Sequence, residues 1–127
     1  MRLDGKTAIV TGAASGFGAG IARIFAREGA SVMVADINTP AARTIAAEIG
    51  GIAHGVDVAN AASVAAMVKA ARDAWGRIDI LVNNAGITHL PKPMEEVTEE
   101  EFDRVLAVNA KSVYLTAREI VPGMKAA

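Results

Sequence analysis

Short runs of apolar and β-branched residues alternate along the chain with longer segments in which apolar positions recur every three or four residues. The short runs predict four strands, at residues 7–10, 31–35, 51–56 and 79–82. The longer segments follow them after turn residues and have the period of amphipathic helices. This alternation predicts a βαβ series, and right-handed crossovers then make the sheet parallel and doubly wound. We therefore expect an α/β fold with strand order 3-2-1-4.

Capping residues mark the start of two of the predicted helices. Thr39, with Pro40 directly after it, predicts an N-cap and a first helical position. Thr98, with Glu101 three residues later, forms a capping box at the start of the fourth helix. That helix is expected to end or bend where Pro122 interrupts it.

A glycine-rich turn, TGAASGFG at residues 11–18, lies between the first predicted strand and helix. In a Rossmann-type sheet this turn lies at the crevice where the strand order reverses, which is where ligands bind. The first N–H groups of the helix and its dipole favour an anion there. The pattern predicts a diphosphate site, although G-x3-G-x-G spacing alone is also compatible with an ordinary loop before a helix. The residues assigned to this site are Gly12, Ser15, Gly16, Phe17 and Gly18.

Asp36 ends the second predicted strand, about twenty residues after Gly18 as expected for a residue that binds ribose. A carboxylate there can accept hydrogen bonds from both hydroxyls of an adenosine ribose, and it would repel a 2′-phosphate. Neither residues 13–17 nor Ile37 include an Arg or Lys to neutralise such a phosphate. The pattern favours NAD over NADP. The alternative is that Asp36 is a turn residue.

Polar turns follow the third and fourth predicted strands in the same crevice. The Asp57 carboxylate can accept a hydrogen bond from an adenine amino group while the Val58 N–H donates to the ring, although the dipeptide also fits a turn before a helix. Asn83-Asn84-Ala85-Gly86 can tie neighbouring loops together and leave room beside a ribose, but it is by itself a turn. We include Asn84, Ala85 and Gly86 in the predicted cofactor site.

Composition narrows the function classes. The chain has 127 residues, 52% of them hydrophobic, a formal net charge of −1 and no cysteine. This describes one domain, and without a basic block no nucleic acid or anionic membrane is expected as a partner. No signal or membrane-spanning segment is expected, which predicts a cytoplasmic location. With no cysteine and only His54 and His89, no metal site is expected, and both histidines are interpreted as ordinary loop or surface residues.

Together these features resemble the short-chain dehydrogenase/reductase family, above all its bacterial 3-oxoacyl-acyl-carrier-protein reductases and polyol or sugar dehydrogenases. The resemblance implies an NAD(P)-dependent oxidoreductase that moves hydride between nicotinamide C4 and a secondary alcohol or ketone. It also implies a homodimer or homotetramer, formed through the apolar fourth helix. The residues that carry the resemblance are Thr11-Gly12-x3-Gly16-x-Gly18, Asp36, Asp57-Val58, Asn83-Asn84-Ala85-Gly86 and Asn109.

Asn109 is the one residue to which the resemblance gives a catalytic role. In the family an asparagine of this helix positions a water in the proton relay. An asparagine within an apolar helix needs hydrogen-bond partners in any case, so a structural contact is the alternative.

The family's serine and its Tyr-x-x-x-Lys normally lie beyond the fourth helix, after a further strand. Tyr114 and Arg118 have the spacing but lie on the fourth helix, and arginine does not replace a tunable lysine, so we reject them as the catalytic pair. Residues 1–127 are therefore expected to form an incomplete NAD(P)-binding Rossmann domain of a longer enzyme. The alternative function is a non-catalytic nucleotide-binding fragment. Residues 88–94 are expected either to line the mouth of the substrate site or to form a surface loop.

Overall fold

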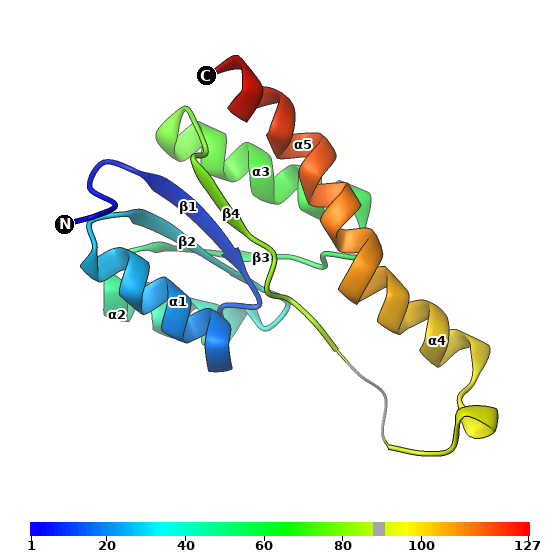
Figure 1. Ribbon diagram of the computed structural model, residues 1–127. Helices are drawn as coiled ribbons and strands as arrows, with labels where there is room; N and C mark the ends of the chain where they lie inside the picture. Colours follow the sequence, from blue (N-terminus) through cyan, green and yellow to red (C-terminus); the bar gives the residue numbers. More distant parts are fainter. Residues whose placement is uncertain (88–90) are drawn as a thin grey trace.

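A computed structural model describes residues 1–87 and 91–127 of the chain. Its centre is a four-stranded parallel sheet in the order β3-β2-β1-β4 (Figure 1). The predicted α/β, doubly wound fold and its strand order are confirmed. The sheet consists of β1 (Thr7–Thr11), β2 (Ser31–Asp36), β3 (Ile52–Gly55) and β4 (Ile80–Val82).

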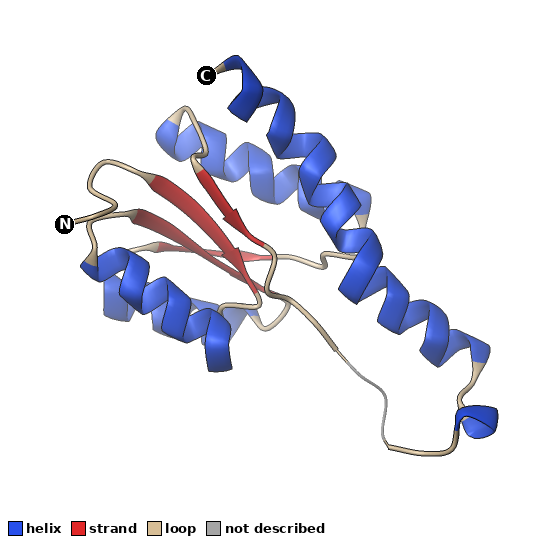
Figure 2. Cartoon of the chain, viewed as in Figure 1, coloured by secondary structure: helices blue, strands red, loops and turns tan. Residues whose placement is uncertain are grey.

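Helices cover both faces of this sheet, as Figures 1 and 2 show. One face is covered by α1 (Gly16–Arg27) and α2 (Thr39–Ile49), and its buried core consists of alanine and valine side chains together with Ile45. The other face is covered by α3 (Ala61–Trp75) and α5 (Ser112–Ala126), and its core contains the larger Ile9, Met33 and Met67. β1 and β2 are buried between the two layers, which fixes the ends of these strands as a rigid base for the loops that follow them.

The start of α2 differs from the prediction by one residue. Asn38 is the N-cap, and its side-chain oxygen accepts a hydrogen bond from the Ala41 N–H at 3.2 Å. Thr39, predicted as the cap, is the first helical residue and Pro40 the second. The asparagine oxygen reaches the third helical amide and takes the place expected of the threonine hydroxyl. The predicted cap of α4 is confirmed, because the Thr98 hydroxyl accepts from the Glu101 N–H at 3.1 Å.

The fourth predicted helix is a continuous rod of three parts, preceded by the short helix η1 (Met94–Glu96). α4 (Glu99–Leu106) passes through a π-helical segment, η2 (Ala107–Lys111), into α5, and the rod extends away from the sheet at its α4 end (Figure 2). Of the two outcomes expected at Pro122, an end is wrong, since α5 continues to Ala126, and a bend stays a prediction. The adjacent turn is held against α3, because Arg72 Nη2 donates to the Glu119 carbonyl at 2.6 Å and Ile120 is buried.

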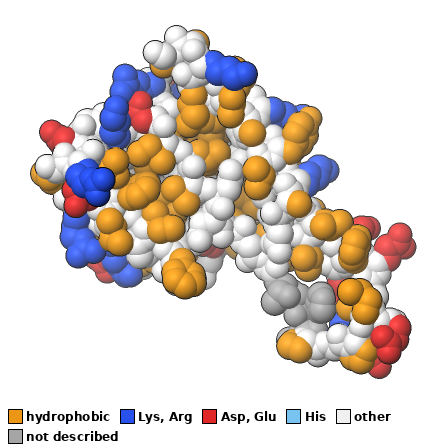
Figure 3. All heavy atoms as spheres, in the orientation of Figure 1, with side chains coloured by type: hydrophobic (Ala, Val, Ile, Leu, Met, Phe, Trp, Pro, Cys, Tyr) orange, Lys and Arg blue, Asp and Glu red, His pale blue; other side chains and the backbone are white. Residues whose placement is uncertain are grey.

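The rod exposes many apolar side chains, and acidic side chains gather at η1 and the start of α4 (Figure 3). Phe102, Leu106, Val113, Tyr114 and Val121 are all exposed. Only Val108, Leu115 and Ile120 among its larger apolar residues are buried. In the described parts of the chain, no helix combines the length and the hydropathy needed to cross a bilayer.

Candidate functional site

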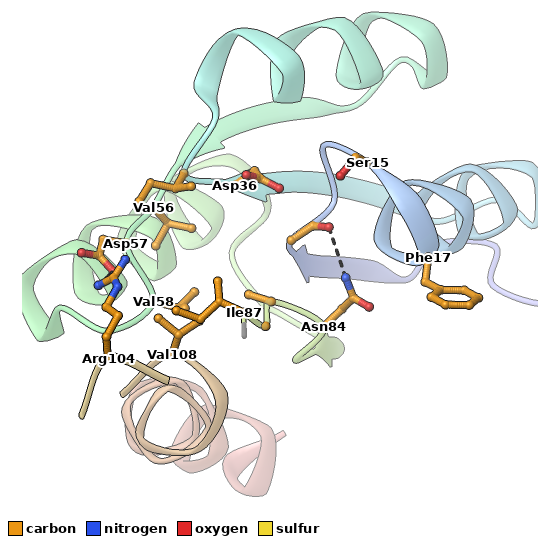
Figure 4. A pocket seen from close by; sticks show the side chains of 14 residues that line it. Ser15, Phe17, Asp36, Val56, Asp57, Val58, Asn84, Ile87, Arg104 and Val108 are labelled. Atoms are coloured by element: carbon orange, nitrogen blue, oxygen red, sulfur yellow. Dashed lines mark hydrogen bonds and ion pairs between the residues drawn. The ribbon is translucent and has the colours of Figure 1, made fainter. Parts of the chain in front are cut away.

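A cavity of about 410 Å³ lies at the carboxyl ends of the strands. Figure 4 shows Ser15, Phe17 and Asn84 on one side of it, and Asp57, Val58 and Arg104 on the other. Nearly all residues assigned to the cofactor site from the sequence line this cavity, which brings together turns that are distant along the chain. The cavity is lined by Gly12, Ser15, Phe17, Asp36, Ile37, Val56, Asp57, Val58, Asn84, Ala85, Gly86, Ile87, Arg104 and Val108.

The glycine turn packs so closely against its neighbours at Gly12 and Gly18 that neither position has room for a side chain. Gly12 has a φ of +64°, and a Cβ added there would lie 2.9 Å from Ala85 Cα. A Cβ on Gly18 would overlap the Gly12 carbonyl and lie 2.5 Å from Asn84 Nδ2. Gly16 has a φ of +57° and open space around it, so there the backbone conformation is what favours glycine. Gly16 and Gly18 do not line the cavity themselves but shape the turn that does.

The first turn of α1 lacks the side-chain cap that other helices have. Ser15 is the N-cap residue but its side chain makes no capping hydrogen bond, and the first turn contains no acidic residue. Among the described residues, no acceptor lies within hydrogen-bond distance of the amides of Gly16, Phe17 and Gly18. By contrast, side chains cap α2, α3 and α4. The unpaired amides and the positive end of the helix dipole therefore face the crevice, where they can bind an anion.

Asp36 joins the glycine turn to the end of β2. Its Oδ2 accepts from the Ala14 N–H at 3.1 Å and its Oδ1 accepts from the Asn38 N–H at 2.9 Å. The second contact is the turn role weighed from the sequence, and the first fixes the carboxylate beside the glycine turn. Ile37 is exposed and borders the same cavity, and within residues 1–87 and 91–127 Asp36 forms no ion pair.

Thr11 and Asn84 connect the glycine turn to the loop after β4. The buried Thr11 hydroxyl accepts from the amides of Asn84 and Ala85, at 3.1 and 3.2 Å, and Asn84 Nδ2 donates to the Gly12 carbonyl at 3.1 Å. Sequence reasoning placed Asn84 and Ala85 here but gave Thr11 no role of its own. Its position at the last residue of a buried strand is the signal that identifies it.

Asp57 and Arg104 form the polar part of the opposite wall. Asp57 Oδ1 accepts from the Ala59 N–H at 3.0 Å, and Arg104 Nη1 lies 3.8 Å from the same oxygen. Val58 is buried beside them. Arg104 was not predicted, because its distance from Asp57 along the sequence gives no sign that the two meet.

Asn109 lies in the π-helical segment and pairs with the backbone of Ile87. Its Oδ1 accepts from the Ile87 N–H and its Nδ2 donates to the Ile87 carbonyl, both at 2.7 Å. The amide of Asn109 thus fixes the chain that leaves β4, which is the structural contact held open from the sequence. π-helical turns often occur at functional sites, because they move side chains out of the α-helical register.

Tyr114 and Arg118 contact each other on the surface of α5. The Arg118 guanidinium lies 5.4 Å from the centre of the Tyr114 ring and donates to its hydroxyl at 3.3 Å. Neither residue lines the cavity. Of residues 88–94, Thr88, His89 and Leu90 lie outside the described residues, so the prediction for that loop is not tested there.

A model of the family described as short chain dehydrogenase matches residues 6–127. The chain belongs to the short-chain dehydrogenase family. The resemblance drawn from the sequence is therefore confirmed.

Relatives in this family act on polyols and other small molecules. The chain is 46% identical to "Sorbitol dehydrogenase" of Cereibacter sphaeroides over 98% of its own length and 49% of the relative's. It is 46% identical to "D-threitol dehydrogenase" of Mycolicibacterium smegmatis over 94% of its own length and 47% of the relative's. The chain thus spans about half the length of the curated relatives it matches.

Solved short-chain dehydrogenases have the same fold. A 3-ketoacyl-(acyl-carrier-protein) reductase from Brucella melitensis complexed with NADH superimposes with a TM-score of 0.95 at 47% identity, over 98% of this chain and 52% of that one. A metagenomic short-chain oxidoreductase in complex with NADP superimposes with a TM-score of 0.92 at 37% identity, over 99% of this chain and 59% of that one. These two relatives were solved with different cofactors.

Proposed function

We propose that the chain is the cofactor-binding part of an NAD-dependent oxidoreductase that acts on a small secondary alcohol or ketone. The observation that carries this proposal is the open N-terminus of α1. Its amides face a cavity that a diphosphate suits, and any Cβ at Gly18 would collide with the turn. The chain's own residues thus fit a dinucleotide.

Each wall of the cavity has its own part in this proposal. The turn at Gly12, Ser15, Gly16, Phe17 and Gly18 binds the diphosphate. Asp36, with Ile37 beside it, binds the adenosine ribose, and Asp57 with Val58 binds the base. The backbone at Asn84, Ala85 and Gly86 lies against the second ribose. A bound nicotinamide supplies the hydride chemistry.

Asn109 has a positioning role in this proposal. Its side chain holds Ile87, which borders the cavity at the end where the chain leaves β4. The family resemblance adds a role in the proton relay.

The substrate class rests on the relatives. Those named as sorbitol and D-threitol dehydrogenases favour a polyol or sugar alcohol, whereas the 3-ketoacyl-(acyl-carrier-protein) reductase favours a 3-oxoacyl thioester. We propose a polyol as the first substrate to test. The apolar side chains exposed on α4 and α5 support the assembly of two or four copies through that rod.

The preference for NAD is tested by Asp36→Ala. Removal of the carboxylate takes away the ribose contacts and the repulsion of a 2′-phosphate, so the ratio of NAD to NADP affinity should fall at least about tenfold. Asp73→Ala on the exposed face of α3 is the matched control. Titration of both cofactors followed by calorimetry gives the ratio, and an unchanged ratio in Asp36→Ala would refute the assigned role of Asp36.

A second candidate is a nucleotide-binding module without catalysis. The open N-terminus of α1 beside the cavity supports this candidate equally, because nucleotide binding requires no catalytic residue. Intact mass and NADH turnover of the purified protein separate the two. A species near 13.1 kDa without turnover supports the module, and a mass of roughly twice that with turnover supports the dehydrogenase.

A further inference from the structure

Arg104 is the only arginine or lysine among the described residues that line the cavity. It lies on α4, and its Nη1 is 3.8 Å from Asp57 Oδ1. The side chains of Arg104 and Asp57 are 48% and 40% exposed, so this pair faces the open cavity (Figure 4). A pair this exposed contributes little to stability. Its position on the wall of a cavity calls for another explanation.

The wall around this pair is apolar. Val56, Val58 and Val108 are buried and line the same end of the cavity, together with Ile87. An apolar slot with one acceptor and one donor at its rim has the chemistry that binds a purine base. The faces of a purine are apolar, and its edge carries hydrogen-bonding groups.

The two oxygens of Asp57 differ in their partners. Oδ1 accepts from the Ala59 N–H and faces Arg104. Oδ2 has no hydrogen-bond partner within residues 1–87 and 91–127 and is free to accept from a ligand. An exocyclic amine on the base suits this oxygen, whereas an exocyclic oxygen at the same place suits the Arg104 guanidinium.

We propose that Arg104 is a specificity-determining residue for the purine base of the cofactor. Its guanidinium covers the base and offers a donor beside the acceptor of Asp57, so that the rim tolerates either an amine or an oxygen on the base. This inference rests on the proposed function, in which adenosine occupies this end of the cavity. Without Arg104, the carboxylate alone faces the base and rejects the oxygen.

The test compares ADP-ribose with its hypoxanthine analogue, inosine diphosphate ribose, by calorimetry on the wild type and Arg104→Ala. We expect the variant to bind ADP-ribose about threefold more weakly and the inosine compound about tenfold more weakly or worse. Arg118→Ala is the matched control, because Arg118 is an exposed arginine of the same rod that contacts Tyr114 and lies outside the cavity. It should bind both ligands as the wild type does.

The ratio of the two affinities separates this proposal from a structural role. An equal loss for both ligands, or none, would overturn it. Arg104→Lys keeps the charge and the helix, so it should restore most of the affinity for the inosine compound. A wild type that binds neither ligand would instead refute the proposed function, whereas wild-type binding with an unchanged ratio in Arg104→Ala refutes only this inference.

Discussion

The amino end of the sheet and the start of α1, at its carboxyl end, differ in how their polar groups are paired. At the amino end, Thr7 and Asp79 bind each other. The Thr7 N–H donates to Asp79 Oδ2 at 2.9 Å, and the Asp79 N–H donates to the Thr7 carbonyl at 3.0 Å. At the carboxyl end, the first amides of α1 have no acceptor among the described residues, and a cavity lies in front of them.

This difference separates a group that stabilises the fold from a group that is kept for a ligand. Polar atoms that hydrogen-bond to one another lower the free energy of the folded chain, but they have no donor or acceptor left for a ligand. A helix whose N-terminal amides stay unpaired lacks the stabilisation of about 1 kcal/mol that an N-cap side chain provides. Such a loss is expected where the missing partner is a ligand, and the three predictions that follow test whether the two ends differ in this way.

The largest effect is expected from Gly18→Ala at the carboxyl end. The added Cβ would overlap the Gly12 carbonyl, so the turn must shift, at a cost of about 3 kcal/mol in stability and a loss of dinucleotide binding of at least about 100-fold. Urea unfolding and calorimetry with ADP-ribose measure the two. Gly20→Ala is the matched control. Gly20 lies in the same helix, and a Cβ added there meets nothing within 4 Å. The Gly20→Ala protein should be about 0.5 kcal/mol more stable than the wild type, with binding unchanged.

Asp79→Asn at the amino end should affect stability and leave binding unchanged. The Thr7 N–H, followed by the Arg77 guanidinium, lowers the pKa of Asp79 below its ordinary value of 3.8. A lowered pKa means that the carboxylate stabilises the fold at pH values above 3.8 and that this contribution is lost as the pH falls below it. The variant should lose about 1 kcal/mol at neutral pH, and its difference from wild type should shrink toward zero in acid.

Urea unfolding at several pH values measures that difference. Asp73→Asn on α3 is a suitable control, because its only ion pair is with the exposed Lys69 within the described chain. A constant difference between wild type and Asp79→Asn at all pH values, or weaker binding of ADP-ribose by the variant, would show that the two ends are not separate.

The smallest effect is expected from a pair of N-cap substitutions. Asn60 caps α3 by accepting from the Ser63 N–H at 2.9 Å, so Asn60→Ala should lose about 1 kcal/mol of stability. Ser15 makes no such bond, so Ser15→Ala should change stability by less than about 0.5 kcal/mol and weaken the binding of ADP-ribose about threefold. Thermal unfolding of the two variants gives the contrast, and equal losses would contradict the open state of α1.

Most of the fold was predictable from periodicity, because each strand is a short apolar run and each helix has a clear amphipathic period. The glycine turn, Asp36 and Asn84 were also predictable, since each comes directly after a strand, and strand ends meet at one edge of a parallel sheet. The roles assigned to these residues are still predictions. An end at Pro122 was one of two expected outcomes and is wrong, because α5 continues through the proline while Arg72 of α3 holds the turn before it.

The remaining features depend on packing that no local pattern encodes. Arg104 meets Asp57 because α5 packs against α3 and Val108 of η2 is buried in the same core, which brings α4 to the rim of the cavity. The pairing of Asn109 with Ile87 likewise depends on the π-helical turn, which sequence propensities do not reveal. Tertiary contacts of this kind decide which polar residues meet.

The Thr11 hydroxyl has a consequence for how the site moves. It is buried, and it accepts hydrogen bonds from the amides of Asn84 and Ala85 in the loop after β4. The glycine turn and the loop after β4 therefore separate only when the end of β1 opens, and β1 lies in the middle of the sheet. In hydrogen exchange, these two loop amides should be protected nearly as long as the central strands, so the crevice stays formed on the timescale at which surface loops fluctuate.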